Sequence, residues 1–130
     1  MKRDLKILDR YLPYNFSKFK CHVISLEINQ GVNKIEEILP SYIKTIRGIY
    51  ITNTFKSDTI HWIGIISLFF SEGAIKNLQM PVINTKRIRH NANPIPMMQE
   101  IKKGSTLEGY YLDIVNYDFS YTVKIYLHYE

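Results

Sequence analysis

The chain has 130 residues, the size of one ordinary domain, and 45% of them are hydrophobic, so a core can form without disulfides or metals. Charged residues make up 22% and aromatic residues 13%, which is typical of a globular protein rather than a disordered one. The formal net charge of +5 is uneven. A basic N-terminal arm (residues 1–18) and a cluster formed by Lys86, Arg87, Arg89 and His90 carry much of it, and such patches can meet phosphates or acidic protein surfaces.

Cys21 is the only cysteine, so no disulfide can form within the chain, which fits a reducing compartment. Its apolar neighbours predict a buried, inert thiol. Asp4 and Asp9 interrupt the N-terminal apolar residues, so no signal peptide is expected. The longest apolar run, residues 60–70, is too short to span a bilayer, and no transmembrane segment is expected.

The first expected element is a short helix over residues 3–12, because Leu5, Leu8 and Leu12 follow helical spacing and Pro13 ends the pattern. Residues 34–39 suit either one helical turn or a short edge strand. Strands are expected at residues 19–28, 43–55, 59–70, 74–83, 97–101, 107–115 and 120–129.

Two of these strands have distinctive positions. Residues 60–70 are apolar on both faces, which indicates a central strand that is buried on both sides or meets a partner. Pro81 cannot donate to a ladder, so its strand is expected either to lie at a sheet edge or to be broken there. Residues 84–96 form the one long irregular stretch.

Seven or eight short strands without a βαβ rhythm predict an all-β protein. We expect one antiparallel β-sandwich domain over residues 1–130, of jelly-roll type, with a short N-terminal helical arm.

No motif predicts catalysis. Neither a nucleophile elbow nor a phosphate-binding or dinucleotide-binding loop is present. The four histidines (His22, His61, His90 and His128) lack metal-ligand spacing, although folding could still bring His61 and His128 together. We therefore expect no enzyme, no cofactor and no metal site.

Tyrosines crowd the last hairpin, at positions 110, 111, 117, 121, 126 and 129. Simple alternation across a sheet accounts for them, with phenol tips reaching solvent or an interface. Alternatively, they could stack on sugars, as in β-sandwich carbohydrate-binding modules. Stacking on nucleobases is less favoured, because Lys and Arg, which would contact the phosphates, are nearly absent from this hairpin, with Lys124 the exception. Trp62, inside an apolar run, is expected in the core.

The basic N-terminal arm, the predicted sandwich and the final strand at residues 122–129 together resemble small virion structural proteins of tailed bacteriophages, such as auxiliary capsid and head- or tail-associated proteins. The resemblance is one of layout over the whole chain and implies a non-enzymatic assembly role without a cofactor. It also implies assembly in the host cytoplasm and localisation in the virion. The surplus of apolar residues at 60–70 points the same way, toward a homo-oligomer or contacts with other virion proteins.

Overall fold

The computed structural model describes residues 19–71, 78–84 and 95–130. Their regular structure consists of eight β-strands: β1 (Lys20–Ile28), β2 (Val32–Ile38), β3 (Thr45–Asn53), β4 (Trp62–Phe70), β5 (Leu78–Ile83), β6 (Ile95–Glu100), β7 (Thr106–Asp113) and β8 (Tyr121–Tyr129). No helix occurs in the described part of the chain.

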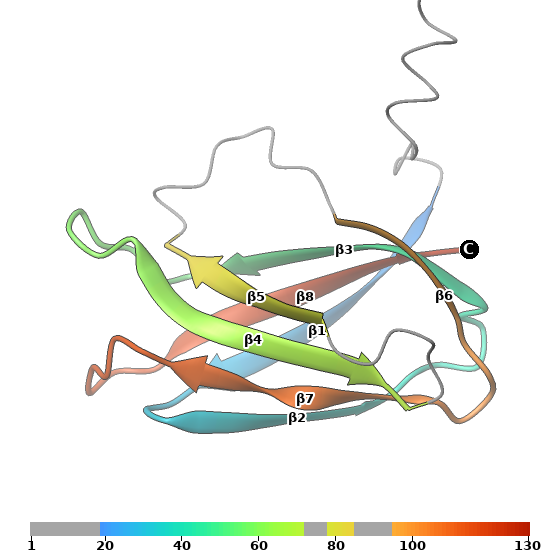
Figure 1. Ribbon diagram of the computed structural model, residues 1–130, viewed down its shortest axis with the longest axis horizontal. Coiled ribbons are helices and arrows are strands. Elements are labelled where there is room, and N and C mark those ends of the chain that lie inside the picture. The colour runs from blue at the N-terminus through green and yellow to red at the C-terminus, as the bar shows by residue number, and fades with distance from the viewer. Residues whose placement is uncertain (1–18, 72–77, 85–94) are drawn as a thin grey trace, which may run out of the picture.

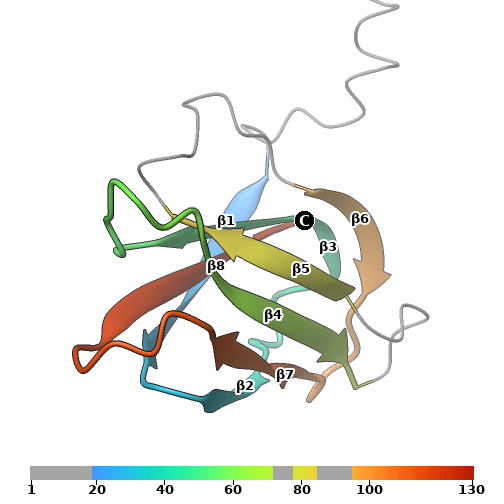
Figure 2. The same cartoon turned by 60° about the vertical axis from the view of Figure 1, so that its left-hand side comes forward.

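The strands form two four-stranded antiparallel sheets (Figures 1 and 2). The front sheet, which faces the reader in Figure 1, has the order β2-β7-β4-β5. The back sheet has the order β1-β8-β3-β6. One cluster of buried apolar side chains from both sheets fills the space between them, as sheet-on-sheet packing requires.

Alternation along each strand explains this packing. In β8 every odd-numbered residue from Tyr121 to Tyr129 is buried, and every even-numbered one is half-buried. Val123, Ile125 and Leu127 are fully buried, because successive strand residues point to opposite faces. Isoleucine and valine at such positions favour the pleated conformation and supply the core at the same time.

Two glycines in the front sheet are required by close contacts. A Cβ on Gly64 would collide with the ring and hydroxyl of Tyr111, which is itself fully buried. Gly109 in β7 has φ +152° and approaches the backbone carbonyl of Ser67 on β4 so closely that no Cβ could fit.

A buried hydrogen-bonded group joins the two sheets. The hydroxyls of Tyr111 (β7) and Tyr121 (β8) are 2.9 Å apart, and Tyr121 donates to Asp113 Oδ1 at 2.7 Å. The backbone N–H of Asn116 donates to Asp113 Oδ2 at 3.0 Å. Burial is the main reason that the pKa values of both tyrosines lie above their ordinary value, so the two phenols stay protonated at neutral pH.

The all-β expectation is confirmed, as is the placement of the main strands. Of the two alternatives for residues 34–39, the structure has the edge strand: residues 34–38 lie in β2, and Leu39 follows it. Pro81 lies in the edge strand β5. The tyrosines of β8 alternate as predicted: Tyr121 and Tyr129 are buried, while Tyr126 is half-buried on the opposite side.

Two expectations lie outside the described residues: the N-terminal helical arm and the cluster of Lys86, Arg87, Arg89 and His90. The expectation for Cys21 is wrong, because its side chain is exposed. In β1 the buried positions are Ile24 and Ile28, so the odd-numbered Cys21 falls on the outward side. Partial desolvation nevertheless raises the pKa of its thiol.

Candidate functional site

The outward face of the front sheet carries a row of apolar side chains across all four strands. Val32, Leu112, Ile65 and Pro81 occupy directly opposite positions on β2, β7, β4 and β5. Val32 is 70% exposed and Pro81 is exposed, while Leu112 and Ile65 are half-buried by their neighbours. We call these four residues the apolar row; adjacency across the ladder makes them one continuous strip.

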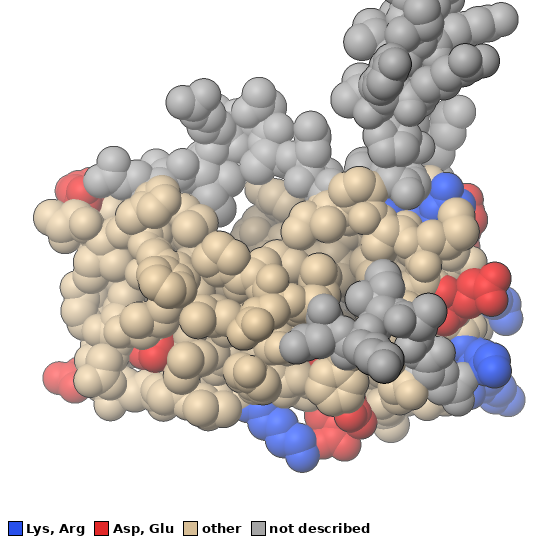
Figure 3. All heavy atoms as spheres, in the orientation of Figure 1, with Lys and Arg blue, Asp and Glu red and all other residues tan. Residues whose placement is uncertain are grey.

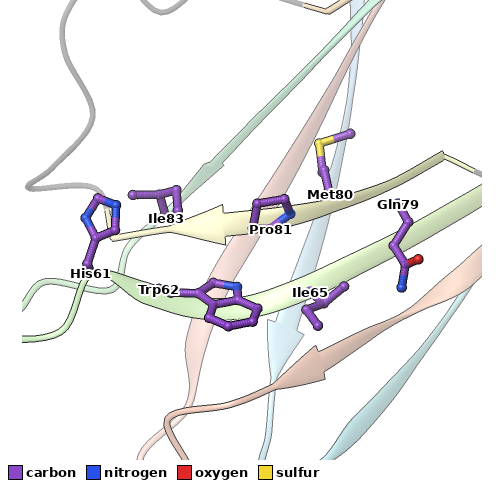
Figure 4. A pocket seen from close by; sticks show the side chains of 7 residues that line it. All are labelled: His61, Trp62, Ile65, Gln79, Met80, Pro81 and Ile83. Carbon is purple, nitrogen blue, oxygen red and sulfur yellow. The ribbon is translucent and has the colours of Figure 1, made fainter.

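A shallow depression of about 540 Å³ adjoins the apolar row between β4 and β5. Its lining is almost entirely apolar and consists of His61, Trp62, Ile65, Gln79, Met80, Pro81 and Ile83. Figure 4 shows the Trp62 ring along β4 between His61 and Ile65, with Pro81 and Ile83 on the neighbouring strand. Among the described residues that line this depression, His61 and Gln79 are the ones with polar side chains.

Trp62 is not a core residue, contrary to the sequence-based expectation, because it is 48% exposed. The register between β4 and β5 shifts between Trp62 and Gly64, and Ile63 is the residue that enters the core. The indole Nε1 donates to the carbonyl oxygen of Gly64 at 2.8 Å. This hydrogen bond fixes the ring against the sheet, where its apolar surface is presented to solvent.

Polar residues border the apolar row on one side. The next positions along the strands are Lys34, Tyr110, Ser67 and Gln79. The row after that consists of Glu36, Glu108 and the apolar Phe69. Glu36 lies opposite Glu108, and Lys34 is 3.2 Å from Glu36. In Figure 3 the surface over β4 and β5 is uncharged, and the charged side chains lie toward its margins. An apolar centre with a polar rim is the usual layout of a protein-protein contact surface.

The outward face of the back sheet differs. Ser25, Lys124 and Thr52 lie opposite one another on β1, β8 and β3. Beside them, Val23, Tyr126 and Tyr50 form the next row, and the two tyrosine rings are 6.0 Å apart between centroids. This face mixes polar and apolar groups and carries no apolar strip across all four strands.

A second exposed feature is an aromatic group at the loop between β7 and β8. The rings of Tyr117 and Phe119 are 5.3 Å apart between centroids, both are exposed, and both contact the buried ring of Phe55. Asn116 and Asp118 complete the lining of a small depression there. Gln30 Nε2 donates to the carbonyl oxygens of Asn116 and Tyr117, so the loop is tied to the turn before β2.

Folding does not bring His61 and His128 together. His61 precedes β4 in the front sheet, whereas His128 lies in β8 of the back sheet, where desolvation lowers its pKa. Among residues 19–71, 78–84 and 95–130, no three His, Cys, Asp or Glu side chains gather closely enough to hold a metal ion. A helix long and apolar enough to cross a membrane is likewise absent from the described part of the chain.

The sequence indicated only part of this surface. The two-faced run at residues 60–70 predicted surplus apolar surface on β4, and Ile65 belongs to it. Val32 lies outside the strands expected from the sequence, and nothing in the sequence aligns Val32 or Leu112 with Ile65. Register between strands creates the apolar row, and register was not predicted.

No protein-family model matches the chain, and neither the curated proteins nor the solved structures contain a match to it.

Proposed function

We propose that this chain is a non-enzymatic structural protein of a phage virion, which assembles with other copies of itself through protein-protein contacts. The observation that carries the proposal is the apolar row with the adjoining depression around Trp62. Soluble proteins rarely leave such a strip exposed, because covering it with a partner removes apolar surface from water.

The extent of the front face suits a stable contact. At ordinary strand spacing and rise, four strands of about seven residues cover about 20 Å by about 23 Å, or about 450 Å² in projection. Accessible surface exceeds the projected area, and one partner in a standard interface contributes about 800 Å². The front face is therefore large enough to supply most of one side of such an interface.

The fold proposed for this role is a jelly roll. The strand orders β1-β8-β3-β6 and β2-β7-β4-β5 place the first strand beside the last and the second beside the seventh, which supports two nested Greek keys. Jelly rolls occur in viral capsid proteins but also in lectins and cupins. The exposed surface, rather than the fold, is therefore the argument for assembly.

The lining of the depression favours a protein partner over a polar ligand. Sites for small polar molecules combine an apolar wall with several convergent donors and acceptors. In the described lining, the polar side chains are those of His61 and Gln79, and they lie at the two ends of an apolar strip. Apolar side chains of another protein surface match such a lining better than a polar ligand.

The test is the molar mass in solution, measured by light scattering over a wide concentration range. We expect a concentration-dependent oligomer whose mass falls when Ile65→Lys is introduced into the apolar row. Thr52→Lys, on the outward face of the back sheet, is the matched control and should leave the mass unchanged. A monomer at every concentration, or equal effects of the two lysines, would overturn the proposal.

Carbohydrate binding is the second candidate, because the exposed rings of Tyr117 and Phe119 lie beside Asn116 and Asp118. Exposed aromatic faces pack on sugar rings, and the amide and carboxylate can bind hydroxyls. The rings are tilted by 48° to each other, so they offer two small platforms rather than one flat one. Retention of the chain on a glycan array that is lost in Tyr117→Ala would favour this candidate.

A further inference from the structure

The four edge strands of the two sheets are not equally protected. β2 and β5 are the edges of the front sheet, and β1 and β6 are those of the back sheet. An edge strand exposes unpaired backbone donors and acceptors, and natural proteins block such edges with charge, proline or irregularity. Three of these edges carry such a device.

In β2 the charged residues are Lys34, Glu36 and Glu37. Pro81 interrupts the edge of β5. In β6, which has only six residues, Pro96 interrupts the edge, and the register with β3 is shifted. Each of these strands therefore resists pairing with another chain.

The β1 edge has no such protection over most of its length. All nine residues from Lys20 to Ile28 pair with β8 in unbroken register, and no other described strand pairs with β1. Six residues, Cys21 to Leu26, lie between Lys20 and Glu27. None of them is a proline, and none is charged when His22 is neutral. This is the long, regular edge that accepts an added strand.

We infer that β1 pairs antiparallel with β1 of a second copy, about a two-fold axis at Val23, and joins two back sheets into one eight-stranded sheet. A two-fold axis makes the same edge complementary to itself, as in most homodimers. This pairing uses a different surface from the apolar row, so it does not depend on the proposed function, and either can fail alone.

Charge selects the antiparallel orientation. In antiparallel pairing about Val23, Lys20 of one copy lies opposite Leu26 of the other, and Glu27 lies opposite Phe19, so neither charge faces a like charge. Parallel pairing in register would instead set Lys20 against Lys20 and Glu27 against Glu27. Like charges directly opposite each other destabilise a sheet, so the antiparallel orientation is favoured.

The exposed apolar groups select the axis position. Val23 is 44% exposed and lies opposite Tyr126, which in turn lies opposite Tyr50. With the axis at Val23, the two Val23 residues lie opposite each other. The row across the joined sheets then reads Tyr50, Tyr126 and Val23 in one copy, followed by Val23, Tyr126 and Tyr50 in the other. The dimer then covers the largest exposed apolar side chain of β1 and extends an aromatic row already present.

The same register places Cys21 directly opposite Ser25 of the second copy, which allows a sharp test. Both residues face outward. Ser25→Cys provides a second cysteine four residues from Cys21, and about 13 Å separates the two within one strand, too far for an internal disulfide. Across the two-fold axis, directly opposite residues lie about 5 Å apart, which suits a disulfide.

We expect Ser25→Cys to form a reducible dimer rapidly under mild oxidation, seen on a non-reducing gel and confirmed by mass spectrometry of the linked peptides. The unaltered chain, whose two Cys21 residues would be about 14 Å apart, should not. Glu27→Cys, two positions further on the same face, is the matched control and should also stay monomeric on the gel. Failure of Ser25→Cys to cross-link, or equal cross-linking by Glu27→Cys, would overturn the inference.

Val23→Lys tests the pairing without cysteine chemistry. The substitution is on an exposed side chain, so folding should be preserved, but the two introduced lysines would meet at the axis. Analytical sedimentation should show the dissociation constant of the dimer raised by about tenfold or more. Association unchanged in Val23→Lys would overturn the inference, whereas loss of association in Ile65→Lys alone would bear only on the apolar row.

Discussion

The front and back sheets bury the same kind of inner surface, but their outer faces differ. The front face carries the apolar row of Val32, Leu112, Ile65 and Pro81, whereas a row of the back face consists of Ser25, Lys124 and Thr52. Inward residues are apolar in both sheets because the core demands it. The outward residues are free of that demand, so a difference between them reports on function rather than on folding.

The most severe way to break the front sheet is a side chain at Gly109. Gly109→Ala sets a Cβ against the carbonyl of Ser67 at a backbone angle that side chains rarely adopt, so β4 and β7 must separate. We expect a loss of more than about 3 kcal/mol in the free energy of unfolding. Urea denaturation measures it.

Gly104→Ala is the matched control, because Gly104 also has positive φ (+83°) but has no atom within 4 Å of the added Cβ. Its cost should be about 1 kcal/mol. Equal costs at the two glycines would show that backbone strain, and not the approach of β4 to β7, determines the effect.

The buried hydrogen-bonded group of Tyr111, Tyr121 and Asp113, which joins the two sheets, is the next most sensitive point. Tyr121→Phe removes the donor to Asp113 and the partner of the Tyr111 hydroxyl, both buried. We expect a loss of about 1–3 kcal/mol, because buried polar groups lose their partners without gaining water. Tyr126→Phe, on the outward side of the same strand, should cost less than about 0.5 kcal/mol. Similar losses from the two variants would contradict a special role for this group.

The same buried hydrogen-bonded group predicts how the free energy of unfolding depends on pH in the alkaline range. Folding raises the pKa of Tyr111 and Tyr121, so the folded state holds protons that the unfolded state loses above its ordinary tyrosine pKa of about 10. The stabilisation is complete below about pH 10 and is lost as the pH rises beyond it. Urea denaturation between pH 8 and pH 12 should show a shallower decline for Tyr121→Phe than for the unaltered chain. Parallel declines would contradict the assignment.

The smallest expected effect is a change in the quenching of Trp62 fluorescence, which tests the contrast between the two outer faces without altering the sheets. Trp62 is the only tryptophan and half of it is exposed on the front face, so its fluorescence reports that face alone. Acrylamide should quench it strongly in dilute solution and less strongly as concentration favours assembly. Unchanged quenching while the molar mass rises would place the contact elsewhere on the molecule.

The sequence predicted features that depend on one strand and missed those that depend on two. For Pro81 an edge position or a break was expected, and it lies in an edge strand; a missing backbone donor is a local property that the sequence reveals. Trp62 and Cys21 were assigned to the interior from apolar neighbours, yet a register shift and simple alternation place them outside. The apolar row required the alignment of β2, β7, β4 and β5, which no single segment encodes.

The position of β8 also has a consequence for how the chain acquires its structure. β8 lies between β1 and β3, so the back sheet cannot form around its centre until residues 121–129 have been synthesised. Contacts between residues so distant in sequence make folding slow, on the scale of milliseconds to seconds. During synthesis, β1 and β3 cannot pair with β8 until β8 has left the ribosome. Until residues 121–129 leave the exit tunnel, β1 has no neighbour in its sheet and β3 can pair only with β6, so the back sheet cannot close before then.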